Sequence, residues 1–385
     1  MTIELIKDTV RDLKNLFEYL EYSLPYYIER VRSIGIPIYS DIIIFEDDLR
    51  GLVNDNTIKF LFVNNIARRN PYYPRIIEII SLDKLMEIMN EYKRYRDIEV
   101  GKEKILLKDP FDDLLQYVAP HVKDSGVIPL VKKIMLLQLF SNGDPGFRSR
   151  IHIALLGDPG TGKTLLLQWQ SSISDGIYVS LRTTSAGLSG SLNPDDFETS
   201  PPPLMAANGK ILCIDEADKI NNRDLDPLLS AMEEGRVILT GARMHIGYDA
   251  RVRVMISSNR TKFRPELLDR FDLIATFKTP TKSEIKEIVG HVIEYSQNYE
   301  LYNKGDELIK SYIKSTENFI PKIKDITRVK SAIGDIIEQT KENSVRGSMR
   351  WLRFAYAYAK LNKVNITDKI IYEVFDKISE IVKMK

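Results

Sequence analysis

The sequence has a single cysteine, no long apolar run and almost no net charge. Cys213 is the only thiol among 385 residues, which excludes an internal disulfide and a zinc site built from several thiolates. No run of 18 or more apolar residues is present, so no transmembrane helix is expected. The first segment, MTIELIKDTVRDL, contains acids and is unlike a signal peptide. We therefore expect a cytoplasmic protein with no membrane partner.

The formal net charge is only +1. A protein whose whole surface coats nucleic acid is usually more basic, so any contact with DNA must come from local loops. Hydrophobic residues make up 43% and charged residues 28% of the chain, which is typical of a globular protein of two or three domains.

Three regions differ in their hydrophobic pattern. Residues 1–100 indicate a mainly helical N-terminal domain. Residues 109–280 alternate short apolar runs with helical stretches, which is typical of an α/β fold with a buried parallel sheet and helices on both faces. Five such runs predict a five-stranded sheet: 151–157, 176–181, 210–216, 252–259 and 273–278. Residues 281–385 contain only helical patterns and predict a helical lid domain.

Within the N-terminal region, the pattern predicts helices at residues 57–69 and 82–96. A short strand is expected within residues 36–45.

The strongest signal follows the run at residues 151–157 directly. It reads G-x-x-x-x-G-K-T and consists of Gly157, Asp158, Pro159, Gly160, Thr161, Gly162, Lys163 and Thr164. Glycines let backbone N–H groups surround phosphate oxygens, and the following helix adds its positive end. The pattern predicts a loop for the phosphates of ATP, with Lys163 on the β- and γ-phosphates and Thr164 as a ligand of Mg²⁺. A chance glycine-rich turn would lack the strand before it and the helix after it.

Two adjacent acids end the run at residues 210–216. Successive side chains of a strand point to opposite sides. We therefore expect Asp215 to bind the nucleotide's Mg²⁺ and Glu216 to act as general base for the attacking water. The alternative is a solvated acidic turn. The presence of the phosphate loop in the same sequence favours the Mg²⁺ and general-base roles over that alternative.

Two further positions follow in order. Asn259 ends an apolar run, where its amide would orient the water beside the γ-phosphate; an ordinary strand-end turn is the alternative. Arg270 follows a short helix and would reach the ATP of a neighbouring subunit, where an arginine stabilises the transition state. Its alternative is a surface salt bridge with Asp269 or Asp272. Together these signals indicate an ATPase of the AAA+ type with ATP sites between subunits.

Longer stretches resemble MCM proteins, the replicative helicases of archaea and eukaryotes. The segment 114–164 is similar to the start of their ATPase core. Five more stretches match in order: SAGLSG (185–190), CIDEADKI (213–220), SAMEEGRV (230–237), LLDRFDLI (267–274) and SVRGSMRWLRFAYAYAKL (344–361). The resemblance extends over residues 109–385.

The resemblance implies the roles of four residues. It places Arg270 on the family's arginine finger and Asn259 on its sensor-1 asparagine. Arg346 falls on the sensor-2 arginine, which contacts the γ-phosphate of a neighbouring subunit's ATP, and Arg350 is the second choice for that role. Without the resemblance, a helical arginine would be interpreted as a solvated side chain.

The resemblance also implies two loops that line a central DNA channel. A helix-2 insert is expected within residues 188–208, and a pre-sensor-1 hairpin at residues 236–253 with its turn at residues 240–243. The family usually has a lysine near this turn, where this sequence has Gly241. Arg243 is therefore the candidate DNA-binding residue, through a phosphate contact, with a solvated arginine as the alternative.

Some modules of the family are not expected here. The first hundred residues are too few to hold the family's oligonucleotide-binding barrel as well as its helical part, and one cysteine excludes its zinc module. No winged-helix domain is expected after the lid. These differences indicate a compact MCM-like ATPase that would suit an archaeal or mobile genetic element.

The sequence thus predicts an MCM-like DNA helicase or translocase that uses ATP and Mg²⁺ and forms a homo-oligomeric ring, a hexamer. Two alternatives stay open. A MoxR-like remodelling ATPase shares the stretch LLSAMEEGRV and acts on proteins. An initiator or loader would use ATP to switch its hold on duplex DNA without unwinding it.

Overall fold

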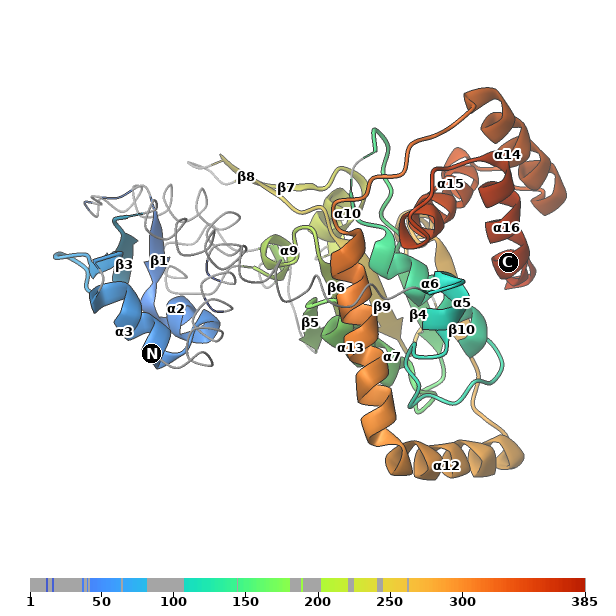
Figure 1. Ribbon diagram of the computed structural model, residues 1–385, viewed down its shortest axis with the longest axis horizontal. Helices are drawn as coiled ribbons and strands as arrows, with labels where there is room; N and C mark the ends of the chain where they lie inside the picture. Colours follow the sequence, from blue (N-terminus) through green and yellow to red (C-terminus); the bar gives the residue numbers. More distant parts are fainter. Residues whose placement is uncertain are drawn as a thin grey trace. The chain divides into compact units, whose positions relative to one another are not determined.

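The chain forms two compact units, shown in the computed structural model (Figure 1). The structure describes Asp12, Leu16, Pro37, Ser40 and residues 42–63, 65–81, 107–143, 145–180, 188–189, 202–220, 225–240, 245–261 and 263–384. One unit consists of residues 1–105, 189–206 and 236–249, and the other of residues 106–188, 207–235 and 250–385. None of the described helices is long and apolar enough to cross a membrane. The helix expected at residues 82–96 lies outside the described residues.

The first unit contains a small antiparallel sheet in the order β1-β3-β2, together with helices α2 and α3. The elements are β1 (Ile43–Phe45), α2 (Glu46–Leu52), α3 (Asp55–Val63), β2 (Ala67–Arg69) and β3 (Ile76–Ile79). Apolar side chains that include Ile44, Leu49 and Leu61 form a separate core. The strand expected within residues 36–45 is confirmed as β1.

The helix expected at residues 57–69 is wrong in its second half. α3 ends at Val63, and Asn65 takes a left-handed conformation with φ of 52° that stops the helix. Asn70 then accepts hydrogen bonds from two amides of the next turn, which folds β2 back against β3. Helical periodicity cannot reveal such a turn, because the decisive hydrogen bonds come from one side chain.

The hairpin expected at residues 236–253 is present. It consists of β7 (Arg236–Thr240) and β8 (His245–Asp249), with Thr240 opposite His245. The turn itself, including Arg243, lies outside the described residues. The Tyr248 hydroxyl donates to the Ser189 carbonyl at 2.8 Å. The described part of the expected insert includes a short helix, α9 (Pro203–Ala206).

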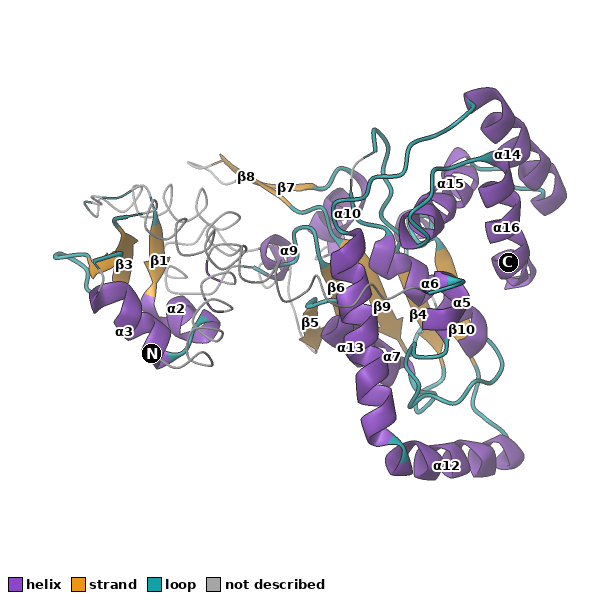
Figure 2. Ribbon diagram, viewed as in Figure 1, coloured by secondary structure: helices purple, strands orange, loops and turns teal. Residues whose placement is uncertain are grey.

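The second unit is built around a parallel sheet in the order β10-β4-β9-β6-β5 (Figure 2). The strands are β4 (Ile153–Gly157), β5 (Ile177–Ser180), β6 (Ile211–Asp215), β9 (Arg253–Ser258) and β10 (Leu273–Phe277). Each lies inside one of the five predicted runs. All residues of β4, β6 and β9 are buried, as central strands covered by helices require.

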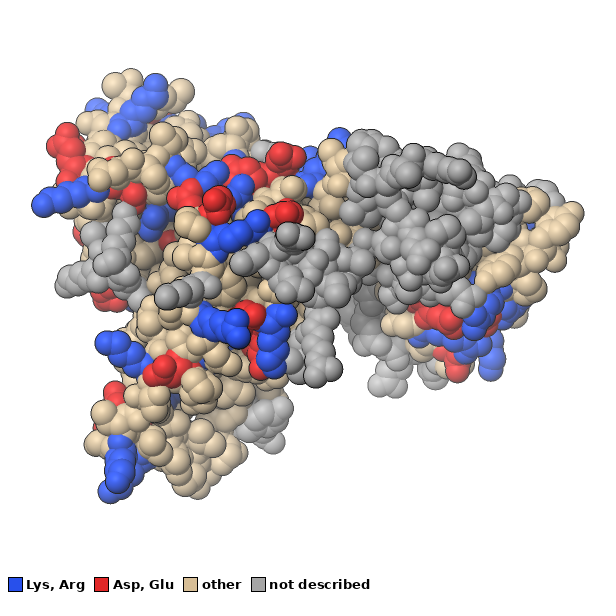
Figure 3. Space-filling view, turned by 180° about the vertical axis from the view of Figure 1, so that it is seen from behind, with Lys and Arg blue, Asp and Glu red and all other residues tan. Residues whose placement is uncertain are grey.

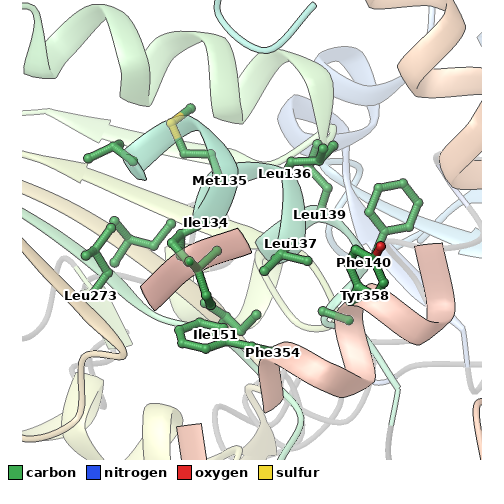
Figure 4. Packing of buried hydrophobic residues seen from close by; sticks show 14 of the residues in the cluster. Ile134, Met135, Leu136, Leu137, Leu139, Phe140, Ile151, Leu273, Phe354 and Tyr358 are labelled. Atoms are coloured by element: carbon green, nitrogen blue, oxygen red, sulfur yellow. The ribbon is translucent and has the colours of Figure 1, made fainter. Parts of the chain in front are cut away.

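Helix α6 (Ile128–Phe140) is buried along most of its length. Figure 4 shows its side chains packed in one cluster with Phe354 and Tyr358 of a C-terminal helix. The other helices of the core are α5 (Pro110–Leu115), α7 (Lys163–Ile173), the 3-10 turn η2 (Ala217–Lys219), α10 (Asp226–Glu233) and α11 (Pro265–Leu268).

The C-terminal part is helical, as expected for a lid. Its helices are α12 (Lys282–Gln297), α13 (Tyr299–Thr316), α14 (Ile326–Thr340), α15 (Val345–Leu361), α16 (Asp368–Ile378) and the 3-10 helix η4 (Ser379–Met384). Thr281 and Glu284 form a capping box at the start of α12, and the Thr367 hydroxyl caps α16. α15 packs against α6, so the lid and the sheet domain share one core.

Candidate nucleotide-binding site

The predicted phosphate loop connects β4 to α7. Gly157, Gly160 and Gly162 have φ of 118°, 71° and 86°, values that side chains disfavour. Gly162 is the N-cap of α7 and no side chain caps this helix end. The first backbone N–H groups of α7 are therefore available to an anion, and the helix dipole favours negative charge there.

The phosphate loop is fixed against β10 at its beginning. A Cβ atom at Gly157 would lie 2.1 Å from the Phe277 carbonyl oxygen, so only glycine fits. The Asp158 carboxylate accepts hydrogen bonds from the Thr279 amide at 2.8 Å and from its hydroxyl at 2.7 Å. These bonds lower the pKa of Asp158. Asp158 thus holds the loop in place.

Lys163 is buried, and its ammonium group lies within the loop. It donates to the carbonyl oxygens of Gly157 at 2.9 Å and Asp158 at 2.5 Å. Burial lowers the pKa of Lys163. A phosphate would offer this ammonium group charged acceptors in place of neutral carbonyls, which makes stronger hydrogen bonds.

Asp215, at the end of β6, is surrounded by hydrogen-bond donors. Its carboxylate accepts from the Thr164 hydroxyl at 3.3 Å, the Tyr178 hydroxyl at 2.7 Å, the Glu216 amide at 3.1 Å and the Ser257 hydroxyl. Burial alone would raise the pKa of Asp215, but the hydrogen bonds, led by that from Ser257, lower it. The side chain is therefore kept as a charged carboxylate beside the phosphate loop.

The residues present fit a magnesium ion. Thr164 and Asp215 supply a hydroxyl and a carboxylate oxygen at one place, and Mg²⁺ binds one or two carboxylates together with phosphates and water. Tyr178 and Ser257 were missed in the sequence. No spacing pattern marks them, because they come from two different strands, β5 and β9, and meet Asp215 only in the folded sheet.

Glu216 has a left-handed backbone with φ of 54° and ψ of 45°, which is unusual for a residue other than glycine. Its amide donates to the Ser257 hydroxyl as well as to Asp215, which holds the strained turn. The side chain turns away from Asp215 and pairs with Lys219 at 2.7 Å. The two adjacent acids therefore have different partners.

Asn259 lies between the phosphate loop and the acids. It follows β9, which pairs with β4 on one side and β6 on the other, and Leu156 is opposite Ser258. Asn259 is exposed, and its backbone amide donates to Asp218 at 3.2 Å. The structure thus brings Asn259 to the same edge of the sheet as Lys163 and Glu216.

The two predicted arginines lie at the opposite edge of the sheet, which is formed by the amino ends of the strands. β10 is parallel to β4, with Leu273 beside Ile153 and Phe277 beside Gly157. Arg270 precedes β10, whereas the phosphate loop follows β4. A strand of five residues at ~3.3 Å each separates the two edges by about 16 Å, more than an arginine side chain spans.

Arg346 joins Arg270 at this edge. Its guanidinium pairs with Asp269 and with Glu233, the latter at 3.0 Å, and Arg270 Nε lies 3.6 Å from the same Glu233 carboxylate. Arg350 does not join them and pairs with Glu342 at 3.4 Å. Arg346 rather than Arg350 therefore accompanies Arg270.

The salt bridge offered as the alternative for Arg270, with Asp269 or Asp272, is not formed. Asp269 binds Arg346, and the buried Asp272 binds Arg353 of α15 at 2.7 Å. Glu233 was missed because it lies on α10, 37 positions before Arg270 in the sequence, and no local pattern connects them.

A cavity of about 210 Å³ lies near the phosphate loop. It is lined by Gln116, Pro120, Val122, Lys123, Asp124, Lys132, His291 and Tyr302. A Cβ atom at Gly162 would be 3.6 Å from Val122, which places this lining residue against the loop. His291 bonds the Pro120 carbonyl oxygen at 2.7 Å and closes the cavity between α12 and the segment before α6. The sequence did not reveal this cavity.

The parallel sheet, the phosphate loop after β4, the acids after β6 and the helical lid define a P-loop nucleotide-binding protein of the AAA+ type. The sequence model of the family described as the MCM P-loop domain matches residues 102–296, about half of the chain. The chain belongs to the MCM family, and the resemblance found in the sequence is confirmed.

Several relatives are similar over larger parts of the chain. A minichromosome maintenance protein of Saccharolobus solfataricus is 24% identical over 86% of this chain and 54% of its own length. An MCM-type protein of Methanocaldococcus jannaschii is 26% identical over 88% of this chain and 50% of its own length. The DNA replication licensing factor MCM4 of Arabidopsis thaliana is 30% identical over 56% of this chain and 29% of its own length. The chain thus spans about half or less of the length of these relatives.

Proposed function

We propose that this chain hydrolyses ATP in a ring of six copies, with each nucleotide between two copies. One copy supplies the residues at the carboxyl edge of its sheet: the phosphate loop with Lys163, and Thr164, Asp215, Glu216 and Asn259. The next copy supplies Arg270 and Arg346. The nucleotide is ATP with Mg²⁺, and the cavity between α12 and the segment before α6 would receive the nucleoside part.

The residues of the carboxyl edge would hold and orient the reactants. The loop amides and Lys163 would bind the phosphates, and Thr164 and Asp215 would hold a Mg²⁺ ion, which would supply positive charge beside the phosphate oxygens. Glu216 accepts a proton from the attacking water, which Asn259 orients. The new bond joins the water oxygen to the γ-phosphorus, the bond to the β-phosphate oxygen breaks, and ADP and phosphate leave.

The separation of the two edges is the observation that carries this proposal. The arginines lie at the amino edge of the sheet, about 16 Å from the phosphate loop along the strands. Arg270 Nε is buried and has no hydrogen-bond partner among the described residues. The Arg270 and Arg346 side chains are 17% and 32% exposed, so a phosphate of another copy can approach their guanidinium groups.

Mixing two inactive variants tests the arrangement. Lys163→Ala removes the phosphate-loop function and Arg270→Ala removes the arginine. If ATP lies between copies, a mixture contains interfaces with an intact loop from one variant and an intact arginine from the other. We expect the mixture to regain ATPase activity that neither variant has alone. A mixture as inactive as its components would contradict the shared site.

We further propose that the ring acts on DNA as a helicase or translocase. On the face shown in Figure 3, Lys and Arg side chains alternate with Asp and Glu side chains among the described residues. Because the net charge of the chain is only +1, DNA contact would come from local loops, and we assign it to the hairpin of β7 and β8, with Arg243 at its turn. We expect single-stranded or forked DNA to stimulate ATP hydrolysis, with strand displacement on the fork.

The same assay distinguishes the other functions. An ATPase rate that DNA does not change, with or without Arg243→Ala, would favour a protein-remodelling ATPase. ATP-dependent binding of duplex DNA without strand displacement would indicate an initiator or loader.

A further inference from the structure

Glu233 forms ion pairs with three arginine side chains at the amino edge of the sheet. Its Oε2 atom lies 3.0 Å from Arg346 Nη2, 3.5 Å from Arg148 Nη1 and 3.6 Å from Arg270 Nε. All three guanidinium groups are thus within ion-pair distance of one oxygen atom. Like charges this close repel one another, and a carboxylate between them offsets the repulsion.

The backbone around Glu233 is well fixed. Glu233 is the last residue of α10, where carbonyl groups lack helical partners. Arg148 donates to the Met232 carbonyl oxygen at 3.2 Å, and Arg150 donates to the carbonyl oxygens of Met232 and Glu233 at 3.3 Å. The carboxylate therefore extends from an anchored helix end.

The two predicted arginines depend on this carboxylate to different degrees. Arg346 has a second partner in Asp269 and also lies near Arg353, which donates to its carbonyl oxygen at 3.1 Å. The Arg270 side chain is 17% exposed, pairs with the Glu233 carboxylate and donates to the Glu266 carbonyl oxygen. Glu233 is thus the group that Arg270 and Arg346 share.

We propose that Glu233 is a positioning residue that holds Arg270 and Arg346 together for the nucleotide of a neighbouring copy. The inference rests on the proposed function, because it requires both arginines to act across the interface. Glu233 itself does not contact the nucleotide. The carboxylate aligns the two guanidinium groups, and it limits their repulsion until the phosphates approach.

Glu233→Gln tests this role, since the amide keeps the size of the side chain and removes its charge. We expect kcat to fall roughly tenfold, as for the loss of one charge-assisted contact, with a smaller change in KM for ATP. The melting temperature should fall only slightly, because the Glu233 side chain is 40% exposed and Arg346 keeps its pair with Asp269. Asp226→Asn is the matched control: Asp226 lies on the first turn of the same helix, pairs with Arg264 at 2.7 Å and should leave kcat unchanged.

Mixtures of two variants show whether Glu233 acts on the nucleotide site of a neighbouring copy or on the site of its own copy. A mixture of Glu233→Gln with Lys163→Ala should exceed the mean rate of the separate variants, because Lys163→Ala supplies an intact Glu233 with its arginines. A mixture of Glu233→Gln with Arg270→Ala should show no such gain, because both substitutions lie at the amino edge and no copy supplies an intact set of arginines with Glu233.

Two results would overturn the inference: a normal kcat for Glu233→Gln, or a gain with Arg270→Ala and none with Lys163→Ala. Either result is compatible with a nucleotide site shared between copies, provided that Lys163→Ala and Arg270→Ala still restore activity when mixed. If those two variants do not restore activity, the proposed function itself is contradicted.

Discussion

The charge on Asp215 depends on side chains from three different elements. Thr164 comes from α7, Tyr178 from β5 and Ser257 from β9, and each donates a hydroxyl to the carboxylate. Burial disfavours a charged carboxylate, and these bonds offset that cost. Asp215 therefore keeps its position and charge before any metal ion arrives.

Tyr178→Phe should weaken the binding of Mg²⁺. The change removes the 2.7 Å hydrogen bond to Asp215 and leaves the ring in place. A hydrogen bond to a charged group contributes about 1.5–3 kcal/mol, so we expect the Mg²⁺ concentration for half-maximal ATPase activity to rise about tenfold. Tyr372→Phe removes a similar bond, to Asp335 in the lid, and should have no effect. Identical Mg²⁺ curves for both variants would contradict the role of Tyr178.

Lys360 is a buried cation whose described hydrogen-bond partners are neutral. It lies on α15, is 2% exposed, and donates to the carbonyl oxygens of Asn142 at 3.1 Å and Glu317 at 3.4 Å. Burial, with a smaller contribution from the charge of Arg253, lowers the pKa of Lys360 to about 8. In the unfolded chain a lysine titrates near pH 10.4, so the folded state loses this proton first.

Stability should therefore rise with pH between about 8 and 10.4, because the unfolded chain binds more protons in that window. Below pH 8 the cost of the buried charge is fully present, on the order of 3 kcal/mol. Lys360→Met removes this contribution. Denaturant unfolding at pH 7 and pH 10 should show a smaller pH dependence for the variant than for the unchanged protein. Equal pH dependence would show that Lys360 does not titrate in this range.

The elements of the sheet domain were predictable because apolar runs and helical stretches alternate regularly. All five strands of the parallel sheet lie within predicted runs, and the phosphate loop and acids follow the strands as expected. The sequence could not reveal contacts between distant elements. The partners of Asp215 and the Glu233 carboxylate beside Arg270 depend on sheet order and helix packing, which periodicity does not determine.

The join between lid and sheet includes a buried ion pair. Arg353 of α15 donates to Asp272 at 2.7 Å, the Asp272 carboxylate accepts from the His152 amide at 2.8 Å, and both side chains are nearly inaccessible. Arg353→Met leaves a buried carboxylate without its cation. Breaking such a pair typically costs about 3–5 kcal/mol, which denaturant unfolding would detect.

A double variant checks the cause of this loss. Arg353→Met with Asp272→Asn removes the buried charge as well, and should be more stable than Arg353→Met alone. If Arg353→Met unfolds at the same denaturant concentration as the unchanged protein, the pair does not hold the lid.

The whole molecule presents different chemistry at the two edges of one sheet. The carboxyl edge carries the phosphate loop and acids, and the amino edge carries Arg270, Arg346 and Glu233. In the proposed arrangement, the carboxyl edge of one copy would meet the amino edge of the next in head-to-tail contact, which closes into a ring when the rotation between copies allows it. Each copy would then complete the site of one neighbour.

If such a ring translocates on DNA, local loops must contact the DNA, because the net charge of the chain is only +1 and its surface as a whole does not attract phosphates. Arg243→Ala tests whether the hairpin turn supplies this contact. For single-stranded DNA, each phosphate contact contributes about 0.7 to the slope of log K against log salt concentration. We expect the slope to fall by about that amount for every engaged copy, and the stimulation of ATPase activity by DNA to fall with it. Arg328→Ala, on the exposed side of α14, should leave both unchanged. The ATPase rate without DNA should be the same in the unchanged protein and in both variants, because the nucleotide site includes neither Arg243 nor Arg328. An unaltered salt slope for Arg243→Ala would assign the DNA contact to another loop.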